Sequence, residues 1–240
     1  MYFGDMGTYN IYFENYQNGH AITETKDVFF HAFMKACSGI MSANFFFLIC
    51  TFLYVYPLYL VSKKWFANYW YYAFLLLVVS FSFWAYGTNG IRNGIAGSLF
   101  LLAISRDKRL VQIALIFLAI NFHKTMLLPT LGFVIAQFYN KPKLFILFWV
   151  FCIPLSLLGG GVWESLFVSL GFDDNRMSYL TDGNVNDDEF SSTGFRWDFL
   201  VYSATAIYAG WYFIVKKKFE DKIYNHIFIT YIFANAFWIL

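Results

Sequence analysis

Two short polar stretches in an otherwise apolar chain contain the residues best suited to chemistry. Gly-Ile-Arg-Asn-Gly at 90–94 places Arg92 at the start of an apolar run, and Asn-Phe-His-Lys-Thr at 121–125 contains His123 and Lys124. An arginine beside a helix N-terminus suits a phosphate, because free backbone N–H groups and the helix dipole also favour an anion. A histidine can act as general base, and a neighbouring lysine disfavours its protonation. We therefore expect Arg92 and His123 to face one pocket at one membrane surface.

Other polar residues are expected on the same side of the membrane. Arg196 and Asp198 open a late apolar run, where Arg196 would be a second anion ligand and Asp198 would orient it or a hydroxyl. Arg176 and Tyr179, three residues apart, would share a helix face if that segment is helical. Asp5 adds a carboxylate. Each of these residues taken alone also fits an interfacial anchor or a solvated loop.

The composition indicates a helical membrane protein. Hydrophobic residues make up 59% of 240 positions and charged residues 13%, about half the share in soluble domains. The net charge of +2 gives no indication of nucleic acid binding. The three cysteines, Cys37, Cys50 and Cys152, have neither metal-ligand spacing nor a CxxC pair. We predict no metal and no cofactor.

The apolar runs predict an all-α, polytopic transmembrane protein with about eight membrane segments. Several runs are shorter than the ~20 residues that cross a bilayer, so tilted or re-entrant segments are expected. Eleven of the 17 basic residues lie at every second connection, which the positive-inside rule places in the cytoplasm. The runs are 43–61, 69–86, 91–105, 110–122, 125–139, 144–158, 199–215 and 223–240.

This topology defines one transmembrane domain, 1–240, with two external segments. Residues 1–41 contain no signal peptide, and 27–40 are predicted to form a short amphipathic helix on the membrane surface. Since no helix precedes that external segment, we expect a fragment lacking the first and last helices of a longer protein. Gly159–Gly161 are predicted to end the sixth helix and begin an external loop, 159–196. Its acidic part lacks the EF-hand pattern, which favours a solvated loop over a calcium site.

The chain resembles the EpsG-type (Wzy-like) bacterial polysaccharide and O-antigen polymerase family. The resemblance rests on Gly-Ile-Arg-Asn-Gly-Ile-Ala at 90–96, Phe-His-Lys-Thr at 122–125 and Arg-Trp-Asp-Phe-Leu at 196–200, and more weakly on Asp5 with Tyr9 and Tyr12. Asn93 stands where the family commonly has glutamine, which shortens the reach of that amide. The segment at 27–29 lacks the Pro-Gly often found beside an acid there.

The resemblance implies a metal-independent, GT-C-like membrane glycosyltransferase at the external face of the bacterial cytoplasmic membrane. It would transfer a glycan from undecaprenyl pyrophosphate to the sugar of another lipid-linked repeat unit, for O-antigen, capsule or exopolysaccharide. A flippase and a chain-length regulator are the expected protein partners. Arg92, with Arg196 or Lys124, would hold the pyrophosphate, with Asn93, Arg176 and Tyr179 as further substrate contacts. His123 would deprotonate the acceptor hydroxyl, and Asp198 or Asp5 would be the alternative base.

Two alternative functions fit the same residues. An O-antigen ligase-type transferase would pass the glycan to another acceptor, such as the lipid A core. A lipid-linked-sugar transporter or flippase should instead carry polar groups near mid-membrane and show inverted repeats. The sequence shows no internal repeat, and its polar groups cluster at one surface, which favours the enzyme.

Overall fold

A computed structural model describes residues 4–24, 27–169 and 197–239, and for 159–169 the course of the backbone only. These residues form helices and no strand, which confirms the all-α prediction. The chain divides into two compact units, unit 1 (Met1–Met126) and unit 2 (Leu127–Leu240). The single transmembrane domain and its external segments stay predictions.

Unit 1 contains the first seven α-helices. α2 lies within the segment predicted as a short amphipathic helix, and α6 and α7 follow the third and fourth apolar runs closely. The helices are α1 (Asp5–Gln17), α2 (Val28–Ser38), α3 (Ala43–Phe66), α4 (Trp70–Val78), α5 (Phe81–Asn89), α6 (Ile91–Ile104) and α7 (Arg109–Phe122).

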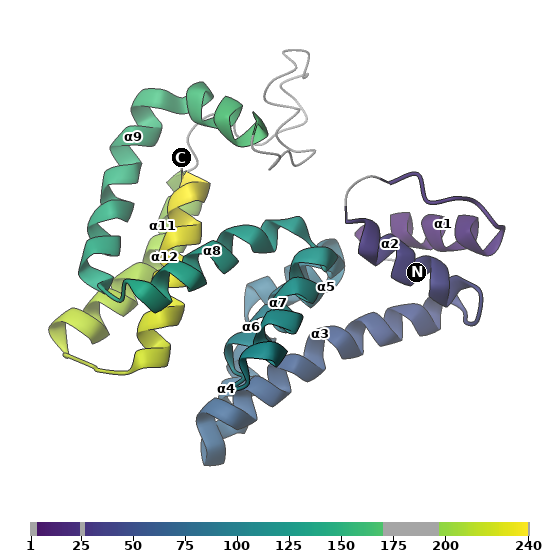
Figure 1. Cartoon of the computed structure of the whole chain (residues 1–240), viewed down its shortest axis with the longest axis horizontal. Coiled ribbons are helices and arrows are strands. Elements are labelled where there is room, and N and C mark those ends of the chain that lie inside the picture. Colours follow the sequence, from purple (N-terminus) through teal and green to yellow (C-terminus); the bar gives the residue numbers. More distant parts are fainter. Residues whose placement is uncertain (1–3, 25–26, 170–196, 240) are drawn as a thin grey trace. The chain divides into compact units, whose positions relative to one another are not determined.

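α6 and α7 form an antiparallel hairpin that determines where the polar stretches lie (Figure 1). The connection between them is only four residues long, 105–108, and connections this short join antiparallel neighbours. The start of α6 and the end of α7 therefore lie at the same end of the hairpin. Arg92 is the second residue of α6 and His123 directly follows α7, so both belong to that end.

The second predicted apolar run is two helices rather than one. Ser80 separates α4 from α5 and caps α5, because its Oγ accepts a hydrogen bond from the Phe83 N–H at 3.3 Å. The backbone at Ser80 is extended, with φ −65° and ψ 144°, which is usual for an N-cap residue. A single serine in an apolar run thus divides the predicted segment into two helices of nine residues each.

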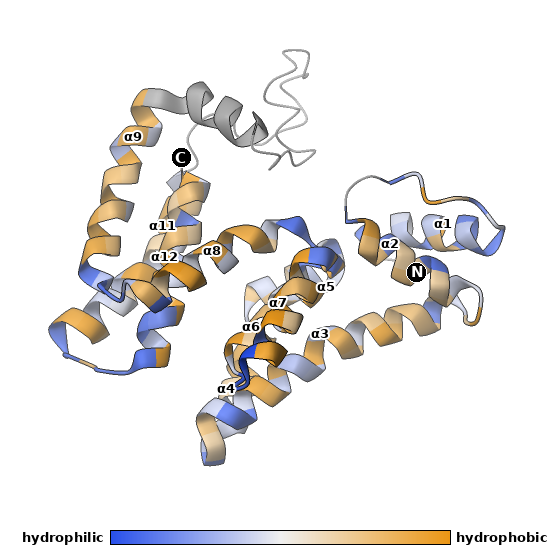
Figure 2. Cartoon of the chain, in the orientation of Figure 1, coloured by the Kyte–Doolittle hydropathy of each residue, from blue (hydrophilic) through white to orange (hydrophobic). Residues whose placement is uncertain are grey.

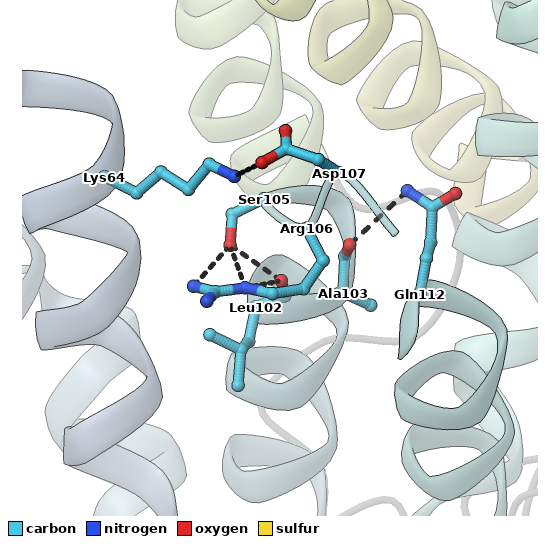
Figure 3. A network of polar contacts seen from close by, with 7 residues as sticks. All are labelled: Lys64, Leu102, Ala103, Ser105, Arg106, Asp107 and Gln112. Carbon is cyan, nitrogen blue, oxygen red and sulfur yellow. Dashed lines mark hydrogen bonds and ion pairs between the residues drawn. The ribbon is translucent and has the colours of Figure 1, made fainter. Parts of the chain in front are cut away.

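The opposite end of the α6–α7 hairpin carries a separate polar network (Figure 3). Lys64, near the end of α3, pairs with Asp107 in the connection. The Arg106 guanidinium donates to the Ser105 Oγ, and the Gln112 side chain donates to the Ala103 carbonyl. These bonds supply N–H donors to the Ala103 carbonyl and the Ser105 hydroxyl at the C-terminal end of α6. The last four backbone carbonyls of a helix have no partner within the helix. Lys64 and Arg106, two of the basic residues predicted on the cytoplasmic side, both lie at this end of the hairpin.

Two helical stretches within the described residues are long and apolar enough to cross a membrane. They are Ala43–Val78 and Trp197–Lys216, and shorter apolar helices cover Ile91–Ile104, Arg109–Phe122, Lys124–Phe138 and Pro142–Leu158. Large apolar side chains remain exposed on several helices, including Phe117 at 69% and Phe138 at 86%. Hydrophobic residues recur along α3 and α7 (Figure 2). The count of about eight membrane spans therefore stays a prediction. The exposed apolar side chains, in contrast, are observed in the structure.

Unit 2 is built around its last helix. The α-helices are α8 (Leu127–Phe138), α9 (Pro142–Ser169), α11 (Trp197–Trp211) and α12 (Lys222–Ile239), with a π-helical turn η3 (Tyr212–Lys216) after α11. α12 packs against α8, α9 and α11, and the Trp149 indole donates to the Asn235 side-chain oxygen at 2.6 Å in the core. The prediction that Gly159–Gly161 end the sixth helix is wrong, because α9 continues through them to Ser169. Intact backbone hydrogen bonding lets a helix include glycines at a cost of about 1 kcal/mol each.

A close contact between α11 and α12 predicts a sensitive glycine. A Cβ at Gly210 would lie 2.0–2.5 Å from ring atoms of the buried Phe228. We expect Gly210→Ala to lower the free energy of unfolding by about 1–3 kcal/mol through overpacking. Gly97→Ala is the control, because no atom lies within 4 Å of its added Cβ. Thermal unfolding in detergent checks both, and an unchanged Gly210→Ala variant would contradict the packing of α11 on α12.

Candidate functional site

The site is organised around one buried carboxylate, that of Asp27. Its Oδ2 lies 3.0 Å from Nη1 of Arg92 and 2.9 Å from Nδ1 of His123, and its Oδ1 accepts the Lys124 backbone N–H at 3.1 Å. Asp27 is only 5% exposed, whereas the side chains of Arg92 and His123 are 28% and 23% exposed. We call these four residues the Asp27 cluster. Its anion is buried and its cationic and titratable groups reach the surface.

The backbone at Asp27 is unusual for a helix cap. Asp27 precedes α2 with φ 50° and ψ 41°, in the left-handed region, and its side chain makes no capping bond. Aspartate often caps helices through its carboxylate, but here all of the observed carboxylate bonds go to α6 and to the end of α7. Non-glycine residues in this region carry about 1–3 kcal/mol of strain, and such strain concentrates at functional sites.

Aromatic packing places α2 next to the end of α7. The ring of Phe122, the residue before His123, lies 5.3 Å from that of Phe29 and 6.0 Å from that of Phe33, both on α2. Phe30 of α2 is fully buried and also contacts the rings of Phe122 and Phe46. Edge-on aromatic contacts of this kind add about 0.5–1.5 kcal/mol each beyond area burial. This contact fixes the distance between Asp27 and His123, which are 96 residues apart.

Arg92 is held on two sides. One guanidinium nitrogen pairs with Asp27, and the guanidinium carbon lies 5.6 Å above the centre of the Tyr9 ring of α1. This distance is within the range of a cation–π interaction. A guanidinium has five N–H donors, so an ion pair through one nitrogen leaves donors for a further anion. The Asp27 carboxylate is therefore one anion beside Arg92, in addition to the phosphate expected there.

His123 is oriented by its bond to Asp27. The backbone at His123 is extended, which ends α7 and turns the ring toward the carboxylate. A carboxylate partner requires a proton on Nδ1, which makes Nε2 the nitrogen that can accept one. The Lys124 side chain is exposed and only its backbone N–H binds Asp27. The next residue, Thr125, has a buried Oγ1 without a hydrogen-bond partner.

The surroundings keep Asp27 ionised. Burial by itself raises the pKa of this carboxyl group, but the hydrogen bond from His123, the charges of His123 and Arg92, and the Lys124 N–H together outweigh it. The pKa of Asp27 is therefore lowered from its ordinary value. An ionised Asp27 favours the Nδ1-protonated form of His123 and holds the Arg92 guanidinium in place.

The structure brings together three of the predicted site residues: Arg92, His123 and Lys124. Asn93 follows Arg92 on α6, and Asp5 is the first residue of α1, one turn before Tyr9. Asp198 is the second residue of α11 in unit 2, which is described separately from the Asp27 cluster. Three predicted substrate contacts, Arg176, Tyr179 and Arg196, lie outside the described residues.

Sequence reasoning missed Asp27, the residue that connects the cluster. The sequence pattern presents Asp27 only as the start of an amphipathic helix, in a segment that lacks the Pro-Gly common in the family. One available signal was its position at a helix N-cap, where an acidic residue is usually interpreted as a capping residue. The other was the resemblance, which places an acid in this segment.

Within the residues that the structure describes, no three His, Cys, Asp or Glu side chains gather as a possible metal site. Metal independence of the reaction stays a prediction.

Comparisons with known proteins give one match. No curated protein and no solved structure matches the chain. The EpsG family matches residues 3–240, nearly the whole length, and the match includes every member of the Asp27 cluster. On this evidence the chain belongs to the EpsG family.

Proposed function

We propose that this protein is a membrane glycosyltransferase that polymerises oligosaccharide repeat units linked to undecaprenyl pyrophosphate. The EpsG family is associated with polysaccharide polymerases, and the two long apolar helices agree with a membrane protein. The observation that carries the proposal is the convergence of Arg92 and His123 on the buried Asp27. This arrangement combines a cation for a leaving phosphate with an oriented base for an attacking hydroxyl.

His123 is the proposed general base. The acceptor hydroxyl oxygen attacks the anomeric carbon of the donor glycan, and its proton passes to Nε2 of His123. The bond between the anomeric carbon and the pyrophosphate oxygen breaks, and undecaprenyl pyrophosphate leaves with that electron pair. Asp27 is a positioning residue, because it holds the Nδ1 proton and stabilises the imidazolium that forms.

Arg92 and the Lys124 side chain are the proposed pyrophosphate ligands. Negative charge grows on the pyrophosphate as the bond to the sugar breaks, and fixed cations stabilise that charge in the transition state. Asp27 fixes Arg92 beforehand through one nitrogen, and the partly exposed guanidinium has further N–H donors for the phosphate oxygens. The exposed Lys124 ammonium adds a second positive charge one residue from the base.

The charge pattern supports our proposal that the site faces the external side of the bacterial cytoplasmic membrane. The Asp27 cluster and the Lys64–Asp107 network lie at opposite ends of the α6–α7 hairpin. The positive-inside rule favours a cytoplasmic location for the lysine-rich end, and this supports an external location for the Asp27 cluster. That face is where repeat units delivered by a flippase would be joined, with a chain-length regulator as the other expected partner.

Complementation tests the proposed activity. The chain is expressed in a host that lacks its own polymerase but still makes and exports the repeat unit. We expect surface polysaccharide to change from single repeat units to a ladder of long chains on a stained gel. Single units transferred unchanged to the lipid A core would indicate a ligase instead. In a host lacking its flippase, restored surface units would indicate a transporter, and either result would overturn the proposal.

A further inference from the structure

A second polar cluster lies between α1 and α2. The Tyr12 hydroxyl donates to Oε1 of Glu24 at 2.7 Å, and the Tyr16 hydroxyl lies 2.9 Å from Nδ1 of His31. The ring of Tyr12 also meets the His31 ring edge to face, with centroids 5.3 Å apart. Glu24 is half-buried, and His31 is only 2% exposed. We call Tyr12, Tyr16, Glu24 and His31 the Glu24 cluster.

The two clusters adjoin each other through α1 and α2. Tyr9, Tyr12 and Tyr16 follow at intervals of three and four residues, so they share one face of α1. From that face Tyr9 contacts the Arg92 guanidinium, Tyr12 binds Glu24, and Tyr16 meets His31. His31 lies one turn after Asp27, and its backbone N–H bonds to the Asp27 carbonyl. One row of tyrosines therefore runs from the phosphate-binding arginine to a carboxylate.

In the Glu24 cluster, the surroundings hold His31 and Tyr12 in their neutral forms. Burial and the charge of Arg92 lower the pKa of His31, which keeps the imidazole neutral as an acceptor for the Tyr16 hydroxyl. The hydrogen bond to Glu24 and burial raise the pKa of Tyr12, which keeps its hydroxyl protonated. Glu24 is then the negative charge of this cluster, and the Tyr12 bond holds it in one place.

The two clusters present charges of opposite sign to a ligand. Arg92 and Lys124 attract an anion, whereas Glu24 repels one. A carboxylate with a free oxygen accepts hydrogen bonds from hydroxyl groups, and tyrosine rings present an apolar body beside a polar tip. A neutral, hydroxyl-rich group is therefore the suitable ligand for the Glu24 cluster.

We propose that Tyr12 and Glu24 bind hydroxyl groups of the acceptor sugar, so that the acceptor enters on the α1 side of His123 while the donor pyrophosphate binds Arg92. The proposal rests on the proposed polymerase function. Glu24 accepts hydrogen bonds from sugar hydroxyls through the oxygen that Tyr12 does not use, and Tyr12 fixes that carboxylate. The Glu24 cluster thereby contributes to the choice of acceptor.

A transfer assay that separates donor from acceptor tests this inference. Membranes containing the full chain receive labelled lipid-linked repeat units as donor and, as acceptor, the soluble oligosaccharide repeat released from the host's own polysaccharide. We expect Glu24→Gln and Tyr12→Phe to raise the KM for the oligosaccharide at least about tenfold, as loss of one charged hydrogen bond does. The KM for the lipid-linked donor should stay as in the wild type.

Glu14→Gln is the matched control. Glu14 also lies on α1 and accepts a side-chain hydrogen bond, from Asn10 at 2.6 Å, but it is exposed. It should leave both KM values unchanged, with all variants compared at equal membrane level and thermal stability. An unchanged acceptor KM in both test variants, or equal losses for donor and acceptor, would overturn the acceptor site alone. A wild-type chain that transfers no glycan would overturn the polymerase function and this inference with it.

Discussion

His123→Ala is expected to reduce the rate of glycan transfer by about 10²–10⁴-fold, the range for loss of a positioned general base. The imidazole is the partly exposed group of the Asp27 cluster that has a ring nitrogen free to accept a proton from a hydroxyl. Binding of the donor pyrophosphate should change little, because Arg92 and Lys124 remain. The expected signature is therefore a lower kcat with a nearly unchanged donor KM, measured in membranes with labelled lipid-linked repeat units.

His226→Ala provides the comparison for this loss. His226 lies on α12 in unit 2 and is also partly buried, with its ring 6.5 Å from that of Phe133. Its removal costs packing but no proposed chemistry, so kcat should stay close to the wild-type value. Equal losses in the two histidine variants would indicate a general effect on folding and would count against His123 as the base.

Arg92→Ala is expected to lower the transfer rate by about 10²–10³-fold, which corresponds to about 2.7–4 kcal/mol of transition-state stabilisation. The substitution removes the phosphate ligand and also leaves the buried Asp27 carboxylate without its guanidinium partner. Arg92→Lys keeps a positive charge but loses the planar fork that can bind Asp27 and a phosphate at once. We therefore expect Arg92→Lys to restore only part of the transfer rate that Arg92→Ala loses. Steady-state kinetics with the lipid-linked donor measures both effects.

Arg106→Ala separates this effect from loss of any arginine. Arg106 is partly buried at the other end of the α6–α7 hairpin, where it bonds to Ser105 and the Leu102 carbonyl (Figure 3). The variant should keep the wild-type rate at matched membrane levels. If Arg106→Ala slows transfer as strongly as Arg92→Ala, the two ends of the hairpin do not differ in function, and the proposed location of the site is wrong.

The sequence predicts most helices because their signals are local. The apolar runs at 91–105 and 110–122 correspond to α6 and α7 within one residue at each end. The sequence pattern does not show the break at Ser80, because apolar residues continue on both sides of it and a single serine can lie inside a helix or cap one. The prediction that the glycines at 159–161 end a helix is wrong because glycine weakens a helix without ending it.

The site was predictable only in part because its central contact is not local. Arg92 and His123 stand out as polar residues at the ends of apolar runs, and a short hairpin must bring those ends together. Asp27 reaches them through packing of Phe29, Phe30 and Phe33 on Phe122, which no local pattern encodes. Its left-handed backbone likewise depends on partners 65 and 96 residues away in the sequence.

The central claim is that Asp27 and His123 act as one unit, and a double-mutant cycle tests it most directly. Transfer rates are measured for Asp27→Asn, His123→Ala and the combined variant, with Asp107→Asn as a control carboxylate from the Lys64 pair. Asparagine keeps the size of Asp27 and tolerates a left-handed backbone, so mainly the charge is removed. Because Asp27 acts through His123 as well as on Arg92, the loss in the combined variant should be much smaller than the product of the two single losses, since residues of one catalytic unit are not additive. Losses that multiply, or an Asp27→Asn variant as active as Asp107→Asn, would contradict the account.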